Sequence, residues 1–180
     1  VRSRGLGDVY KRQEYGVLMR RDEENKALIK NLLIFPLDDQ LYALDIAVVD
    51  ELIPLPEITS IGSTLPCVKG IIDLRGTIVP VINLKTRLGL NSRPYELDDA
   101  VVIVTVNNLI AGLIVDAGSF VLEFPASAIS SSPEMIKGIA QQYLSGWGRT
   151  EKGLFILLDP EKLLGRKELE VLQKITSPSS

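Results

Sequence analysis

The chain has 180 residues, a net charge of −3 and 46% apolar residues, which is typical of a folded domain and excludes a disordered one. This charge gives no indication of a nucleic-acid partner or an anionic membrane surface. Cys67 is the single cysteine, so no intramolecular disulfide can form and a reducing, cytoplasmic compartment is expected. Histidine is absent, which removes the commonest general base and zinc ligand. We therefore expect no catalysis, no metal and no cofactor.

The first residues lack any hydrophobic period. Residues 8–13 (DVYKRQ) resemble a translated sequencing adapter, so we interpret residues 1–18 as an assembly artefact or disordered leader and Met19 as a natural start. The later apolar runs are short, and none approaches the roughly 20 residues that a membrane span requires. We expect no direct membrane insertion.

Short strands separated by turns are predicted throughout the first half. Two β-permissive runs around Asp38-Asp39 are typical of a hairpin, and two more flank Arg75-Gly76, where glycine favours a turn. The predicted elements are strands at 32–37, 40–46, 51–55, 70–74 and 77–83, with helical pieces at 46–50 and 84–88.

The second half follows a polar linker at 89–99 and has the same order of patterns. Asn107-Asn108 separates two apolar runs, as Asp38-Asp39 does in the first half. The predicted elements are strands at 101–106, 109–115, 120–124 and 154–158, an extended segment at 143–149, and an amphipathic helix at 160–175 broken near Gly165.

The two halves match as an internal repeat. Residues 32–46 align with 101–115 at an offset of 69, and Pro56 aligns with Pro125 at the same offset. Residues 68–71 align with 136–139 at an offset of 68, and residues 79–90 align with 155–166 at an offset of 76. A repeat this long predicts two related β-subdomains, each a closed or nearly closed small barrel.

Arg75 is the principal candidate for function. It lies between two strongly apolar strands, where a charge is costly unless it is paired or exposed at a turn. One interpretation is a solvated turn arginine; the other is a guanidinium presented to a protein partner. Asp45 and Asp116 are further carboxylates without a visible partner, and the glycines around Trp147 lack the lysine and hydroxyl residue of a phosphate loop.

The segment VKGIIDLRGTIVPVINLKTRLGL closely resembles the signature of the CheW-like family, the coupling proteins of bacterial chemotaxis arrays. The resemblance runs from about Leu32 to Leu172 and includes FPLDDQLYALDIAVVDEL and FILLDPEKLL. It implies a mainly β fold of two SH3-like five-stranded barrels with short helices and a C-terminal helix. The expected CheW-like domain covers 19–175, with subdomain 1 at about 31–90, subdomain 2 at about 100–160, a helix at about 160–175 and a tail at 176–180.

The resemblance also implies a function without chemistry. Family members bridge the cytoplasmic tips of transmembrane chemoreceptors and the regulatory domain of the chemotaxis histidine kinase. The receptor-facing groove between the subdomains is expected to include Val49, Glu51, Gly70, Arg75 and Gly112. A ring-forming face for the kinase is expected near Thr77, Val79 and Val81.

The sequence also departs from the family pattern. Asp73 stands where asparagine is usual, so an ion pair between Asp73 and Arg75 is one expectation. Other functions remain open from sequence: an adaptor of a pilus-motility or other non-flagellar array, or a fragment of a longer CheW-domain protein, such as a kinase C-terminus or a receiver-linked adaptor. From a different class, a carboxylate-based hydrolase would need two facing acids.

Overall fold

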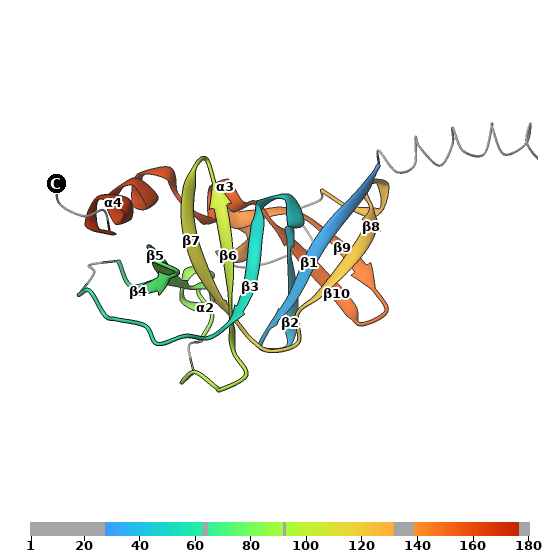
Figure 1. Cartoon of the computed structure of the whole chain (residues 1–180). Helices are drawn as coiled ribbons and strands as arrows, with labels where there is room; N and C mark the ends of the chain where they lie inside the picture. The colour runs from blue at the N-terminus through green and yellow to red at the C-terminus, as the bar shows by residue number, and fades with distance from the viewer. Residues whose placement is uncertain (1–27, 63–64, 92, 132–138, 177–180) are drawn as a thin grey trace, which may run out of the picture.

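The computed structural model describes residues 28–62, 65–91, 93–131 and 139–176, so the predicted leader and residues 177–180 lie outside the described part (Figure 1). Within that part the chain is mainly β, and its strands form two five-stranded sheets. The sheets lie side by side, with short helices around them (Figure 1). The predicted fold class is confirmed.

One sheet, called barrel A, combines strands from the beginning of the described chain with strands from its second half. Its strand order is β8-β1-β2-β10-β9. The strands are β1 (Ile29–Leu37), β2 (Gln40–Asp45), β8 (Phe120–Pro125), β9 (Leu144–Thr150) and β10 (Gly153–Leu158).

The other sheet, called barrel B, uses the middle of the chain in the order β3-β6-β7-β5-β4. Its strands are β3 (Val49–Pro54), β4 (Val68–Leu74), β5 (Thr77–Asn83), β6 (Ala100–Val106) and β7 (Leu109–Val115). The helices are η1 (Ile46–Val48), α2 (Leu84–Arg87), η2 (Ala126–Ala128), η4 (Ile139–Tyr143), α3 (Pro160–Leu163) and α4 (Arg166–Thr176). The interruption between α3 and α4 falls at Gly165, as predicted.

The predicted subdomain boundaries, 31–90 and 100–160, do not match the two sheets. Barrel B is the continuous segment 49–115, whereas barrel A combines β1 and β2 with β8, β9 and β10. The β1–β2 hairpin pairs with second-half strands, in parallel with β10 and antiparallel with β8. The repeat is therefore present, but its two halves exchange hairpins. Sequence similarity shows which segments are equivalent and not which copy each one pairs with.

The strand registers confirm two of the three repeat offsets. In barrel B Val81 lies opposite Gly112, and in barrel A Leu157 lies opposite Ala43, which reproduces the offsets of 76 and 69. The third alignment is wrong for Gly70, whose structural counterpart is Gly146. Each of these glycines follows a register shift in its strand pair. The residue after each glycine, Ile71 or Trp147, forms a β-bridge with the loop that precedes the strand. Most of the segment 136–139, to which the sequence alignment assigned it, lies outside the described residues.

Three apolar cores result from this exchange. Along β1, Leu33 and Phe35 face the space between the barrels, whereas Leu32 and Ile34 face the interior of barrel A. β6 alternates in the same way, so both central hairpins are buried on two faces and their sequences are almost continuously apolar. The interior of barrel B is aliphatic and consists of Ile72, Val79, Val81, Val101, Ile103 and Ile114.

Candidate functional site

Arg75 lies in a two-residue turn between β4 and β5. Arg75 has φ 51° and Gly76 has φ 87°, so both central residues adopt the left-handed conformation that tight hairpin turns require. The Gly76 amide donates a 2.7 Å hydrogen bond to Asp73 Oδ1. The turn predicted at Arg75-Gly76 is confirmed, and it leaves the Arg75 side chain exposed.

The Arg75 guanidinium pairs with Glu51, not with Asp73. Arg75 Nη2 lies 2.5 Å from Glu51 Oε1, and the Arg75 side chain is 73% exposed. The hydrogen bond and the charge of Glu51 raise the pKa of Arg75. Because Glu51 belongs to β3 and Arg75 to the β4–β5 turn, the ion pair joins the two edges of the barrel B sheet. Asp73 Oδ1 accepts the turn amide instead, and the Arg75 ion pair is with Glu51.

Two further predicted residues, Thr77 and Val49, lie near this pair along the chain. Thr77 is exposed at the start of β5, and Val49 is half-buried at the start of β3. Leu52 on β3 and Ile78 on β5 are large apolar side chains that are 44% and 36% exposed. Barrel B thus presents an exposed arginine together with exposed apolar residues on its edge strand β3 and on β5.

The other four predicted contact residues are buried, and the structure corrects their assignment. Val79 and Val81 have no exposed surface because β5 is covered on both faces. Gly112 is a packing position, since a Cβ there would lie 2.7 Å from Val101 Cγ1. At Gly70 a Cβ would lie 2.1 Å from the carbonyl oxygen of Thr59, so glycine permits close approach of the loop to β4. The two valines fill the interior of barrel B, and the two glycines allow neighbouring atoms to approach the strands closely.

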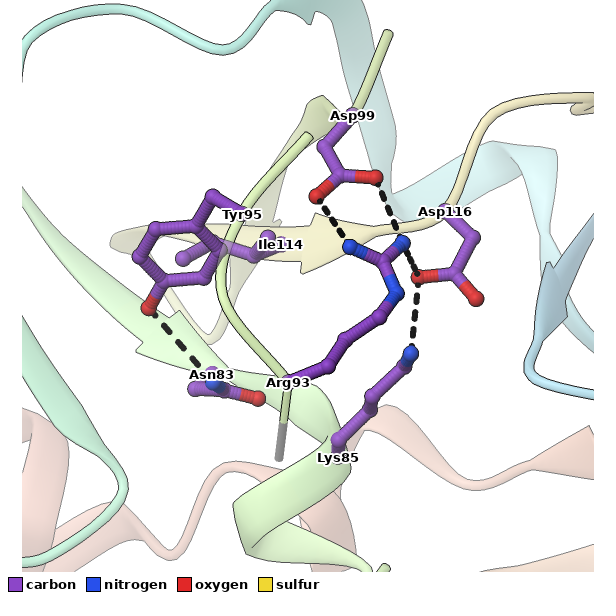
Figure 2. A pocket seen from close by; sticks show the side chains of 7 residues that line it. All are labelled: Asn83, Lys85, Arg93, Tyr95, Asp99, Ile114 and Asp116. Carbon is purple, nitrogen blue, oxygen red and sulfur yellow. Dashed lines mark hydrogen bonds and ion pairs between the residues drawn. The ribbon is translucent and has the colours of Figure 1, made fainter. Parts of the chain in front are cut away.

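A second polar cluster lies between the barrels, and the sequence did not predict it (Figure 2). Lys85, from α2, is only 6% exposed and contacts Asp38 at 2.6 Å and Asp116 at 3.1 Å. Arg93 forms two hydrogen bonds with Asp99, at 2.9 and 3.1 Å, and a third with Asp116 at 2.9 Å. The sequence did contain one indication of this cluster. Lys85 lies between Leu84 and Leu88 in a predicted helical turn, and a charge that is buried there needs a partner.

The charges in this cluster neutralise one another. Burial lowers the pKa of the Lys85 ammonium, but Asp38 and Asp116 outweigh it and raise the pKa overall. Burial acts to raise the pKa of Asp99, yet hydrogen bonds from Arg93 and the Glu96 amide hold it below its ordinary value. The Lys85 ammonium and the Asp99 carboxylate are thereby kept in their charged forms, which is the behaviour of a structural ion-pair network.

The described residues contain neither a cluster of candidate metal ligands nor a helix suited to cross a membrane. No group of three or more Cys, Asp or Glu side chains among them is arranged to hold a metal ion. Asp45, considered from sequence as a free carboxylate, accepts a hydrogen bond from the Ala47 amide at the start of η1. None of the described helices has the length and hydropathy that a bilayer span needs.

Two SH3-like five-stranded barrels, fused through exchanged hairpins, define a double-barrel protein. The sequence profile of the family described as "CheW-like domain" matches residues 31–168. The chain belongs to this family, whose members are chemotaxis scaffold proteins.

Individual relatives agree with this assignment. The chain is 32% identical to the chemotaxis protein CheW of Klebsiella aerogenes over 146 residues, covering 81% of this chain and 88% of that protein. It is also 32% identical to the chemotaxis protein CheW of Treponema pallidum, covering 80% and 87%. The crystal structure of the scaffolding protein TtCheW from Thermoanaerobacter tengcongensis superposes with a TM-score of 0.70 at 34% identity, covering 77% and 90%.

Proposed function

We propose that the protein is a non-catalytic cytoplasmic adaptor that couples the signalling tips of membrane-anchored chemoreceptors to the regulatory domain of the chemotaxis histidine kinase. The observation that carries the proposal is the exposed Arg75–Glu51 pair on barrel B of a CheW-like chain. The names of the relatives support a role in chemotaxis, and the scaffolding title of the structural neighbour supports an adaptor.

The geometry of Arg75 suits recognition better than stability. An exposed ion pair contributes only about 0–1 kcal/mol to folding, because water and salt screen it. Among the described residues Glu51 pairs with Nη2, which leaves other guanidinium donors of Arg75 for a partner. Glu51 holds the side chain in one orientation, so less rotamer entropy is lost when a partner binds. Leu52 and Ile78 add apolar surface to barrel B.

Binding of the folded protein to a chemoreceptor signalling tip and to the kinase regulatory domain, each immobilised separately, tests the proposal. Arg75→Ala is expected to weaken receptor binding about tenfold, the effect of removing an interface arginine. Its unfolding temperature is expected to stay within about 2 °C of the parent.

Lys152→Ala provides the matched control. Lys152 is an exposed cation in the corresponding two-residue turn of barrel A, so its loss removes the same charge from the other barrel. This variant is expected to bind the receptor tip as the parent does. If the folded parent binds neither partner, or if both variants weaken receptor binding equally, the proposal is wrong.

A further inference from the structure

The two barrels adhere through a large apolar core that does not by itself define their relative orientation. Residues of β1 and β2 from barrel A and of β6 and β7 from barrel B share this core with Leu84, the first residue of α2, and Leu88, directly after it. Hydrophobic burial is non-directional, so it favours contact between the two surfaces but specifies their angle only weakly. Ion pairs have defined distances and directions, and a buried pair therefore favours one arrangement.

Helix α2 carries a cation toward each end of this interface. It is a single turn that follows β5 of barrel B, and its Lys85 and Arg87 side chains are 6% and 15% exposed. Asn83 caps the helix by accepting a 3.2 Å hydrogen bond from the Thr86 amide. The cap and the buried flanking leucines fix the helix, and hence the origin of both cationic side chains.

Lys85 forms the first connection, which we call the Lys85 clamp (Figure 2). Its ammonium contacts Asp38, in the β1–β2 turn of barrel A, and Asp116, directly after β7 of barrel B. The Asp38 amide donates a 2.8 Å hydrogen bond to Asp116 Oδ2. Arg93 holds the other oxygen of Asp116 at 2.9 Å. The barrel A turn is thus bonded directly to two elements of barrel B, α2 and the residue after β7, and Arg93 holds the second of these in place.

Arg87 forms the second connection, the Arg87 clamp, with elements that follow barrel A strands. Its Nε donates a 2.9 Å hydrogen bond to the Leu163 carbonyl in α3, and Nη2 lies 2.6 Å from Glu168 Oε2 in α4. The guanidinium also lies over the Tyr143 ring, 5.4 Å from its centre. Both clamps start on one helical turn, only two residues apart in sequence.

We propose that α2 sets the angle between the barrels through these two clamps, so that removal of either one lets the barrels rock on their apolar interface. The apolar core supplies the adhesion, and the clamps supply the orientation. This role is independent of which partner the protein binds, and it assigns Lys85, Asp38 and Arg87 as positioning residues.

The width of an inter-barrel distance distribution tests this inference. Nitroxide labels are placed at exposed strand positions, Val121→Cys on β8 and Leu52→Cys on β3, in the full chain with Cys67→Ala, and double electron–electron resonance is recorded. Lys85→Met keeps the side-chain length, removes the charge, and is expected to broaden the distribution about twofold. Arg87→Met is expected to do the same, and the double variant to be broader than either.

Asp38→Asn is the milder variant, which decides the question if Lys85→Met does not fold. Asp38 is half-exposed and has φ 55°, a conformation that asparagine tolerates, and Asp116 remains as a partner for Lys85. A smaller broadening is expected. Glu51→Gln, which weakens an ion pair inside barrel B, is the control and should leave the width unchanged. If the variants stay folded and neither the Lys85 nor the Asp38 change broadens the distribution, the inference is overturned, whatever happens to the unfolding midpoint.

Discussion

The two barrels share one topology but are filled differently. In barrel A, Gly148 on β9 lies opposite Phe155 on β10. The equivalent residues of barrel B are Ile72 on β4 and Val79 on β5. A Cβ on Gly148 would lie 2.6 Å from the Phe155 ring, so the missing side chain makes room for the aromatic one. The same space is therefore occupied by one large and one absent side chain in barrel A, and by two medium ones in barrel B.

The edges of the barrels show a second difference. In barrel B the β4–β5 turn is joined to β3 by the Arg75–Glu51 ion pair. At the equivalent place in barrel A, Lys152 from the β9–β10 turn lies over the ring of Phe120 on β8, 4.3 Å from its centre. Both turns deliver a cation to the opposite edge strand, but one meets a carboxylate and the other an aromatic face. The repeat thus preserves backbone geometry and leaves the side-chain chemistry of each barrel free to differ.

Glycine substitutions at the loop–strand contacts should give the largest difference between the barrels. Gly70→Ala is expected to cost about 4 kcal/mol, because its Cβ would meet the Thr59 oxygen at 2.1 Å and its φ is 152°. Gly146→Ala, whose Cβ would lie 2.6 Å from the Ile129 Cγ2 methyl and 2.9 Å from the Ser130 carbonyl oxygen, is expected to cost about 2 kcal/mol, because its nearest contact is a side chain and its backbone contact is longer. Urea unfolding measures both losses. If the two variants lose the same free energy of unfolding, the two loops are packed equally tightly against their strands.

The complementary filling of the interiors can be tested by copying barrel B into barrel A. Phe155→Val leaves a cavity and is expected to cost about 3 kcal/mol. Adding Gly148→Ile and Phe124→Leu, which reproduces Ile72 and Leu55 of barrel B, should recover about 2 kcal/mol. A thermodynamic cycle from urea unfolding gives the coupling. If the changes in unfolding free energy caused by the three substitutions are additive, the side chains that fill the barrel A interior are not energetically coupled.

Asp99 anchors the linker that enters barrel B, and its loss should destabilise the protein by about 2 kcal/mol near neutral pH. Because the pKa of Asp99 is below its ordinary value of 3.8, its contribution is present above that pH and is lost as the pH falls through the folded-state pKa. Asp99→Asn should therefore flatten the loss of stability as the pH falls below the ordinary carboxyl pKa of 3.8.

Unfolding followed by both circular dichroism and fluorescence shows whether that effect stays in barrel B. Trp147, the single tryptophan, lies on β9 of barrel A. Because the apolar core is shared, its transition should shift with the backbone signal. An Asp99→Asn variant that keeps the acid sensitivity of the parent would contradict the assignment of Asp99.

The two turn contacts should have the smallest effects on stability. Glu51→Gln in barrel B and Lys152→Ala in barrel A are each expected to change the free energy of unfolding by about 0.5 kcal/mol or less, because both pairs are exposed. Thermal unfolding at low and high salt measures the two changes. A loss above about 2 kcal/mol for either variant would mean that the turn contact holds its barrel closed.

Local elements could be predicted from sequence because their determinants are local. The hairpin turns at Asp38-Asp39 and Asn107-Asn108, the turn at Arg75-Gly76 and the break at Gly165 all follow from nearby residues. The exchange of hairpins could not be predicted, since equivalent strands are equally compatible with either barrel.

The candidate site was predictable only in part for the same reason. Exposure of Arg75 follows from its turn, whereas burial of Val79 and Val81 depends on β6 and β7 covering β5. Sequence left open whether Arg75 pairs with Asp73, which is near in the chain; its ion pair is with Glu51, which is near in space. The Lys85 network escaped prediction because its carboxylates come from residues 47 positions before and 31 positions after the lysine.

The exchanged hairpins impose an order on folding during synthesis. Barrel B is continuous, so all its strands have left the ribosome once residue 115 and the exit tunnel have been passed. Barrel A cannot close at that stage, because residues 46–119 separate β2 from β8 and its parallel partner β10 emerges later still. The nascent β1–β2 hairpin, apolar on both faces, must therefore wait against the finished barrel until the last strands arrive, and vectorial synthesis builds the protein from its middle outward.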